Sequence, residues 1–132
     1  MSKSLQARIL VVDDEPKLHD RLVKELELDF NLFSASGGFE CLRLIKSVQP
    51  DVILLDVHMI GLSGHEVCMR LKAEPFSRRI PVVLMSGLSR EEDIEAAFKS
   101  GADYFLAKPF SYQELINKLL IVLAVNPPTI NK

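Results

Sequence analysis

The chain has 132 residues, of which 48% are hydrophobic, and its 16 basic and 18 acidic side chains give a net charge of -2. This length and composition suit one domain that buries a full core without disulfides or a structural metal. The charge balance favours neither a nucleic-acid surface nor a membrane surface.

The opening MSKSLQAR lacks the apolar segment of a signal peptide. No apolar run approaches the roughly 18 residues of a membrane span. Cys41 and Cys68 fall inside predicted helices without CxxC spacing, so we expect buried thiols rather than a disulfide. These features together predict a cytoplasmic domain.

Short apolar runs alternate with amphipathic segments along the chain. In chain order they predict strand 8–13, helix 16–28, strand 30–36, helix 39–48, strand 51–57, helix 65–73, strand 80–87, helix 89–101, strand 102–107 and helix 111–124. Ser89 and Ser111 suit the N-caps of the last two helices. Strands that are apolar on both faces and alternate with helices indicate an α/β fold, with a parallel sheet covered on both sides.

Polar side chains follow four of the predicted strands. They are Asp13 and Asp14 after the first strand, Asp56 at the third, Ser86 at the fourth and Lys108 after the fifth. In a doubly wound sheet, ligands bind beyond the carboxyl ends of the strands. Carboxylates suit Mg²⁺, and a lysine can hold a phosphoryl oxygen. This set predicts phosphoryl transfer, with Asp56 as the nucleophile that forms an aspartyl phosphate.

Each of these residues has a plainer explanation when it is taken alone. Asp13 and Asp14 could be acids that the dipole of the following helix favours. Asp56 could be a loop acid, Ser86 a turn residue and Lys108 a solvated lysine. Their convergence on one edge favours a site, because chemically perturbed groups cluster in sites.

The same motifs resemble the receiver domain of two-component response regulators. The resemblance is carried by VVDDEP, LLDVHMIGLSGHE, LMSG and GADYFLAKPF, and it covers residues 7–124. Residues 1–6 would be an N-terminal tail, and residues 125–132 a C-terminal tail or the start of a linker. The resemblance implies a flavodoxin-like, doubly wound (βα)5 sandwich, with five parallel strands in the order 2-1-3-4-5.

The resemblance also implies a metal site and a phosphorylation site. Asp14 and Asp56 would bind Mg²⁺ directly, Asp13 through a water and His58 through its backbone carbonyl, with Mn²⁺ as a substitute. Asp56 would accept a phosphoryl group from a sensor histidine kinase or a histidine phosphotransfer protein. Self-phosphorylation and self-dephosphorylation are implied, rather than the turnover of an enzyme.

Further roles follow from the resemblance for the residues around the phosphoryl group. Lys108 would contact that group, Ser86 would move toward it, and the small Gly87 would leave access to it. Phe105 occupies the position of the switch aromatic. The peptide bond between Lys108 and Pro109 would be cis.

Three positions depart from the family's pattern. Ile60 stands where the family often has proline, and Phe105 lacks the hydroxyl of the commoner tyrosine. Leu88 is apolar where polar residues are frequent. We expect Leu88 to shield the phosphoryl group from water, so that Leu88→Glu changes the lifetime of the phosphorylated form.

The resemblance places a downstream output domain or protein and a homodimer contact on one face, formed by the fourth helix, the fifth strand and the last helix. It implies no direct contact with nucleic acid or membrane.

Two other functions stay open. A pseudo-receiver would be a binding module without phosphorylation, although such domains usually lose some of the site residues present here. An aspartyl-phosphate hydrolase would need DxD, but Asp56 is followed by Val57 and His58.

Overall fold

The computed structural model describes residues 6–128, in which strands and helices alternate. The elements are β1 (Arg8–Val12), α1 (Pro16–Leu26), β2 (Asn31–Ala35), α2 (Gly38–Val48), β3 (Val52–Asp56), α3 (Gly64–Ala73), β4 (Val82–Ser86), α4 (Glu91–Lys99), β5 (Tyr104–Ala107) and α5 (Tyr112–Val125). Every predicted strand and helix is present, and only the ends differ. The expected tails at 1–6 and 125–132 fall mostly outside the described residues, although α5 reaches Val125.

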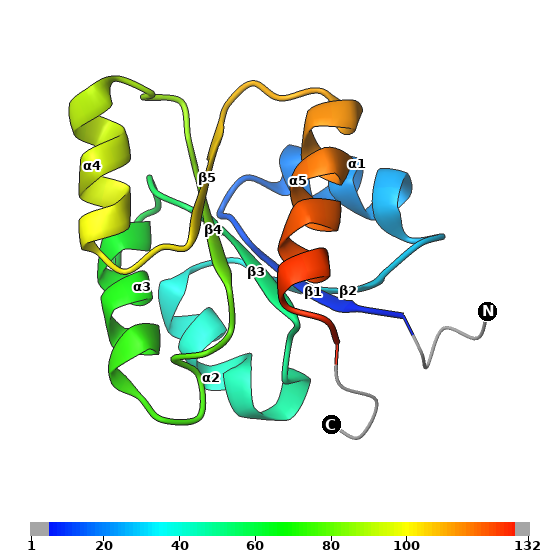
Figure 1. The fold of residues 1–132 in the computed structure, drawn as a ribbon, viewed down its shortest axis with the longest axis horizontal. Helices are drawn as coiled ribbons and strands as arrows, with labels where there is room; N and C mark the ends of the chain where they lie inside the picture. Colours follow the sequence, from blue (N-terminus) through cyan, green and yellow to red (C-terminus); the bar gives the residue numbers. More distant parts are fainter. Residues whose placement is uncertain (1–5, 129–132) are drawn as a thin grey trace.

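The strands form one parallel sheet in the order β2-β1-β3-β4-β5, which confirms the predicted doubly wound topology. Helices α1 and α5 cover one face of this sheet, and α2, α3 and α4 cover the other (Figure 1). Successive residues of each strand point to opposite faces. Leu10 and Ile53 therefore pack toward α2 and α3, whereas Ile9 and Leu54 pack toward α1 and α5.

Two of the three inner strands of the sheet, β3 and β4, are almost entirely apolar and are covered on both sides. All residues of β3 and β4 are buried, as expected for parallel strands covered on both faces. Cys41 and Cys68 are buried free thiols in the core between the sheet and α2–α4, as predicted. Burial raises the pKa of Cys41 to about 12, so that thiol stays protonated.

The two predicted serine caps have different outcomes. The Ser111 hydroxyl accepts a hydrogen bond from the Glu114 amide at 3.0 Å, which confirms the predicted cap of α5. The prediction for Ser89 was wrong, because α4 begins at Glu91 with Arg90 as its N-cap. The Asp93 carboxylate accepts from the backbone N–H of Arg90 at 3.1 Å and from its Nε at 2.8 Å, and this closes the first turn instead.

Within residues 6–128, each helix is too short or too polar to cross a membrane.

Candidate functional site

The sheet register brings the predicted site residues to one edge. Val12 is opposite Leu55 in the β1–β3 pair, so the next residues, Asp13 and Asp56, end neighbouring strands. Ser86 is opposite Ala107 in the β4–β5 pair, so Lys108 follows at the same level. Because all the strands are parallel, their carboxyl ends meet at this edge.

Three carboxylates gather at this edge. Asp13, Asp14 and Asp56 each offer an oxygen, and these oxygens lie within 4.8 Å of one another. Asp13 and Asp56 are only 1% and 6% exposed, whereas Asp14 is exposed. Like charges this close repel each other, and burial removes the water that would screen them. A hard divalent cation relieves both costs with oxygen ligands, so these residues fit Mg²⁺.

Lys108 supplies the cation of the site. Its Nζ lies 3.1 Å from Asp13 Oδ2 and 3.1 Å from Asp56 Oδ1. Burial alone would lower the pKa of Lys108, but the hydrogen bonds and charges of Asp56 and Asp13 outweigh it and raise that pKa. Lys108 therefore stays positively charged between the two carboxylates, and it offsets only part of their charge.

Asp56 differs from an ordinary carboxylate. Burial raises its pKa, and the charges of Asp13 and Asp14 act in the same direction. Lys108 lowers the pKa of Asp56 but does not cancel these effects. The contact with Lys108 therefore keeps the lysine protonated but does not restore the ordinary pKa of Asp56. A bound divalent cation would add a second positive charge and favour the ionised form of Asp56.

Backbone amides hold the other two carboxylates. The amide of Glu15 donates to Asp13 Oδ1 at 2.8 Å. The amide of Ile60 donates to Asp14 Oδ2 at 3.0 Å, from the loop between β3 and α3. Ile60 therefore gives this loop a hydrogen bond to the acidic cluster, which the sequence did not indicate.

The hydroxyl of Ser86 lies at the end of β4, where its side chain is buried. It accepts a hydrogen bond from the Leu88 amide at 3.0 Å, while the Leu88 side chain is 46% exposed. Gly87 borders open space, since a Cβ added there would meet nothing within 4 Å.

The structure places His58 and Phe105 in different surroundings. His58 is exposed on the loop that follows Asp56. Phe105 is half-buried and packs against the core beneath α2, α3 and α4. The predicted switch aromatic thus lies on the α4 side of the sheet, away from α1.

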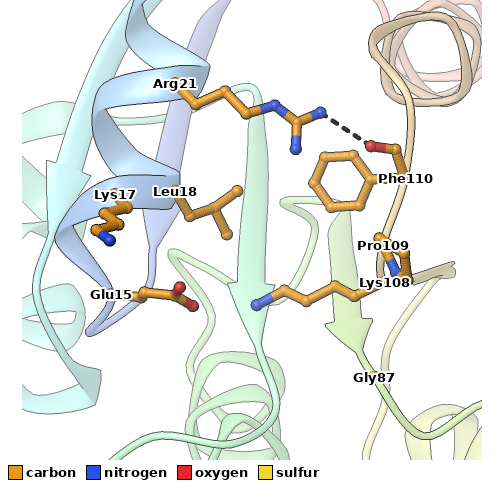
Figure 2. Close-up of a pocket in the computed structure, with 8 residues that line it drawn as sticks. All are labelled: Glu15, Lys17, Leu18, Arg21, Gly87, Lys108, Pro109 and Phe110. Carbon is orange, nitrogen blue, oxygen red and sulfur yellow. Dashed lines mark hydrogen bonds between the residues drawn. The ribbon is translucent and has the colours of Figure 1, made fainter.

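Beside Lys108 is a cavity of about 550 Å³ between α1 and the loop from β5 to α5 (Figure 2). The peptide bond between Lys108 and Pro109 is cis. Arg21 of α1 donates from Nη2 to the Phe110 carbonyl at 2.8 Å, and its guanidinium lies 5.3 Å from the centre of the Phe110 ring. Arg21 therefore ties α1 to the loop that carries Lys108.

Sequence reasoning missed Arg21 and Gly64. Arg21 and Phe110 are 89 residues apart, and no local pattern marks such a contact. Gly64 begins α3 directly beneath the site, where a Cβ would collide with the Asp56 carbonyl and lie 2.8 Å from Val57 Cα. The sequence shows a glycine at the start of the predicted helix. It does not show that this end of the helix packs against the backbone of Asp56 and Val57.

Comparison with known proteins agrees with this geometry. The chain matches the response regulator receiver domain family over residues 9–120. It is 33% identical over 117 residues to the DNA-binding dual master transcriptional regulator RpaA of Synechocystis, covering 88% of this chain and 48% of that protein. The chain thus spans about half the length of the curated relatives that it matches.

Solved structures show the same fold. The receiver domain of a signal transduction histidine kinase from Syntrophus aciditrophicus is 31% identical, with a TM-score of 0.85, and the match covers 93% of this chain and 94% of that one. The receiver domain of the sensor histidine kinase PA1611 from Pseudomonas aeruginosa is 25% identical, with a TM-score of 0.82 and coverage of 90% and 98%. That structure holds a magnesium ion in its active site cleft. The chain belongs to the response regulator receiver domain family.

Proposed function

We propose that Asp56 is the phosphoacceptor of this receiver domain and that phosphorylation requires Mg²⁺. The observation that carries the proposal is the position of the Asp56 carboxylate, which lies 3.1 Å from Lys108 Nζ and within the cluster of three acids. The donor would be a sensor histidine kinase or a histidine phosphotransfer protein. The fold supports this assignment, since parallel α/β sheets bind ligands at this edge.

Asp56, Lys108 and Ser86 would have separate roles in phosphoryl transfer. A carboxylate oxygen of Asp56 attacks phosphorus, the bond from phosphorus to the donor nitrogen breaks, and the electron pair leaves with the donor imidazole. Lys108 can exchange a carboxylate oxygen for a phosphoryl oxygen, because its ammonium is a mobile point charge. The Ser86 hydroxyl can donate to another phosphoryl oxygen.

The metal would be held by Asp13, Asp14, Asp56 and the backbone carbonyl of His58. When bound, Mg²⁺ supplies charge neutralisation for the phosphoryl oxygens, and Mn²⁺ could substitute for it. Three acids and one lysine leave excess negative charge for a divalent cation to offset. The chain would thereby favour transfer only with the cation present.

Phosphorylation would change the shape of the surface formed by α4, β5 and α5. Ser86 moving toward the phosphoryl group would break its hydrogen bond from the Leu88 amide, which begins the loop before α4. Phe105 would then reorient beneath α4, and the face formed by α4, β5 and α5 would change toward an output partner or a second copy. Gly87 leaves room for this change.

The test is intact mass after incubation with Mg²⁺ and acetyl phosphate. The wild type should gain one phosphoryl mass and Asp56→Asn should not, with the exposed Asp20→Asn as the matched control. No gain in the wild type would favour a pseudo-receiver. Release of inorganic phosphate in many turnovers, without a phosphoprotein, would favour the hydrolase.

Leu88 tests a finer part of the proposal. We propose that its side chain shields the phosphoryl group from water, because its backbone is bonded to Ser86 beside the site. Leu88→Glu should shorten the half-life of the phosphorylated form severalfold, and the measurement is decay of the phosphoprotein mass after the donor is removed. An unchanged half-life would contradict this role.

A further inference from the structure

The side chain of Ile60 is exposed to solvent, whereas its backbone amide contacts the acidic cluster. Its side chain is 92% exposed and so contributes little to packing. Its N–H, however, donates to Asp14 Oδ2 at 3.0 Å, which joins the loop after β3 to a residue 46 positions earlier. The contribution of Ile60 to the site therefore comes from its amide and not from its side chain.

We propose that the Ile60 amide is a positioning group that orients Asp14 for a divalent cation and makes the loop between β3 and α3 move together with it. This inference rests on the proposed Mg²⁺ site. It assigns a role to a residue that contributes no side-chain ligand.

Asp14 needs this support more than the other two acids. Asp13 is buried and is held by the Glu15 amide and by Lys108. Asp56 is buried and is held by Lys108. Asp14 is exposed, and within residues 6–128 the hydrogen bond recorded for its carboxylate is the one from Ile60. Without that bond the carboxylate would sample several rotamers and would lose this freedom on binding a cation.

The hydrogen bond leaves the carboxylate able to bind metal. Each carboxylate oxygen has two lone pairs, so Oδ2 keeps one when it accepts from Ile60, and Oδ1 keeps both. The amide is thus expected to assist the cation rather than compete with it.

The bond also couples the metal to the loop. His58, whose carbonyl is a proposed ligand, lies two residues before Ile60. The loop would then be held at two nearby points, at the metal through His58 and at Asp14 through Ile60. Cation binding should therefore reduce the motion of the loop between β3 and α3.

The decisive comparison is Ile60→Pro with Ile60→Ala. Proline removes the donor, whereas alanine keeps it and removes only an exposed side chain. Mg²⁺ affinity is measured by titration of backbone amide shifts in NMR spectra. Ile60→Pro should bind about tenfold more weakly than the wild type, as is typical when a partner of a metal ligand is lost. Ile60→Ala should bind like the wild type.

The outcomes separate the two proposals. If the wild type shows no Mg²⁺-dependent shifts, the proposed metal site fails and this inference fails with it. If the wild type binds and folded Ile60→Pro binds equally well or more tightly, only the role of Ile60 is overturned. Loss of affinity in Ile60→Ala as large as that in Ile60→Pro would also overturn it, since the side chain would then be responsible.

A second measurement does not depend on proline being tolerated. Hydrogen exchange of the Ile60 amide is compared in the wild type, Asp14→Ala and the exposed-acid control Asp20→Ala, all without Mg²⁺. Asp14→Ala should speed this exchange about tenfold, because the acceptor is gone. Equal exchange in all three proteins would show that the bond does not protect the amide, and the inference would be wrong.

Discussion

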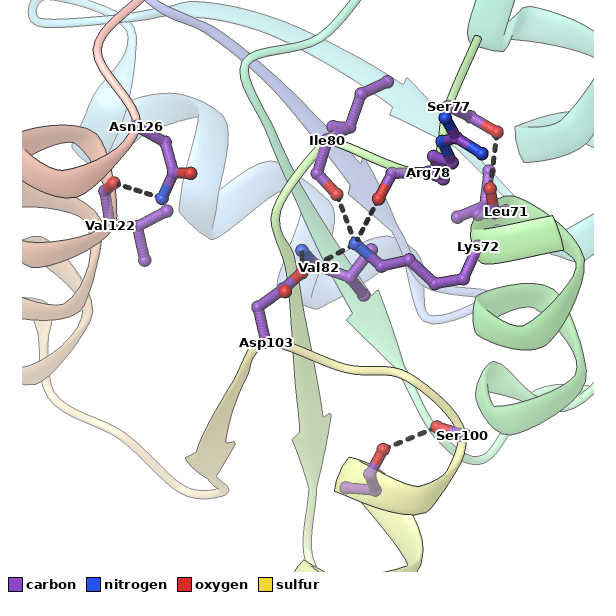
Figure 3. Close-up of polar contacts among 11 residues, drawn as sticks. Leu71, Lys72, Ser77, Arg78, Ile80, Val82, Ser100, Asp103, Val122 and Asn126 are labelled. Atoms are coloured by element: carbon purple, nitrogen blue, oxygen red, sulfur yellow. Dashed lines mark hydrogen bonds and ion pairs between the residues drawn. The ribbon is translucent and has the colours of Figure 1, made fainter. Parts of the chain in front are cut away.

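Two partly buried lysines, one at each end of the sheet, meet aspartates in different ways. At the amino ends of the strands, Lys72 Nζ donates to the Arg78 carbonyl at 3.1 Å, the Ile80 carbonyl at 2.8 Å and Asp103 Oδ2 at 2.7 Å (Figure 3). At the carboxyl ends, Lys108 contacts two carboxylates at 3.1 Å. The two lysine side chains are similarly exposed, at 18% and 21%.

The difference lies in the balance of charge. Lys72 has three oxygen acceptors, and Asp103 also accepts from the Val82 amide at 2.8 Å, so one cation and one anion satisfy each other. At the other end, one lysine faces three acids. The balanced pair of Lys72 and Asp103 joins α3 to the starts of β4 and β5. The unbalanced acidic cluster, in contrast, has the charge and the oxygen ligands that suit a divalent cation.

The largest expected effect tests whether packing, rather than charge, holds the carboxyl edge together. Gly64→Ala would drive a Cβ against the backbone at Asp56 and Val57, which cannot move as a flexible side chain can. We expect a loss of about 3 kcal/mol in the free energy of unfolding. Urea denaturation measures it, and Gly37→Ala, whose Cβ would meet nothing within 4 Å, is the control. Equal losses in both variants would contradict this account.

Lys72→Met tests how much the pair of Lys72 and Asp103 stabilises the fold at the amino ends of the strands. Removing the ammonium leaves two carbonyls and Asp103 without their donor, and we expect a loss of about 2 kcal/mol, since this pair is partly exposed. Denaturation gives the stability, with the exposed Lys24→Met as control. Mg²⁺ affinity should stay at the wild-type value, and a change in it would show that the two edges are not independent.

Lys108→Met should affect stability less than Lys72→Met does, but it should change metal binding, which Lys72→Met leaves unchanged. Without Mg²⁺, Lys108→Met leaves the acids unpaired and should cost about 1 kcal/mol of stability. It also removes a positive charge from the cluster, so Mg²⁺ should bind severalfold more tightly, as followed by NMR titration. Weaker Mg²⁺ binding would contradict this expectation. It would mean that Lys108 assists metal binding by positioning Asp13 and Asp56, and that this outweighs its repulsion of the cation.

The smallest expected effect is a pH dependence that comes from Asp56. Burial raises the pKa of Asp56, so its neutral form is favoured in the folded state. Its stabilising contribution is present at low pH and is lost as pH rises through that raised pKa. In denaturation without Mg²⁺, Asp56→Asn should therefore gain stability relative to the wild type as pH rises through this range. A difference that does not vary with pH would contradict the pKa shift.

The gathering of the candidate site residues at one edge was predicted from the sequence, because these residues directly follow strands. Asp13, Asp56, Ser86 and Lys108 each end or follow an apolar run, and parallel strands bring such positions together whatever the details of packing. The α/β class with a parallel sheet was predicted from the alternation of strands and helices, which allows few arrangements. The strand order 2-1-3-4-5 was implied by the resemblance to receiver domains.

Contacts between distant segments were decided by the tertiary structure. The bonds from Ile60 to Asp14 and from Arg21 to Phe110 join residues 46 and 89 positions apart, and neither depends on a local pattern. The cap of α4 also escaped prediction, because the Asp93 carboxylate closes the turn by bonding Arg90, and Ser89 lies outside the helix.

The sequence by itself determined the order of the elements, the edge at which the site forms and the chemical types gathered there. Local hydrophobic periodicity and strand ends suffice for these features. Only the tertiary structure decided how the charges are distributed, with a balanced pair at Lys72 and an excess of acid at Lys108. Such balance depends on distances of a few ångströms between side chains from different elements, which a linear pattern does not contain.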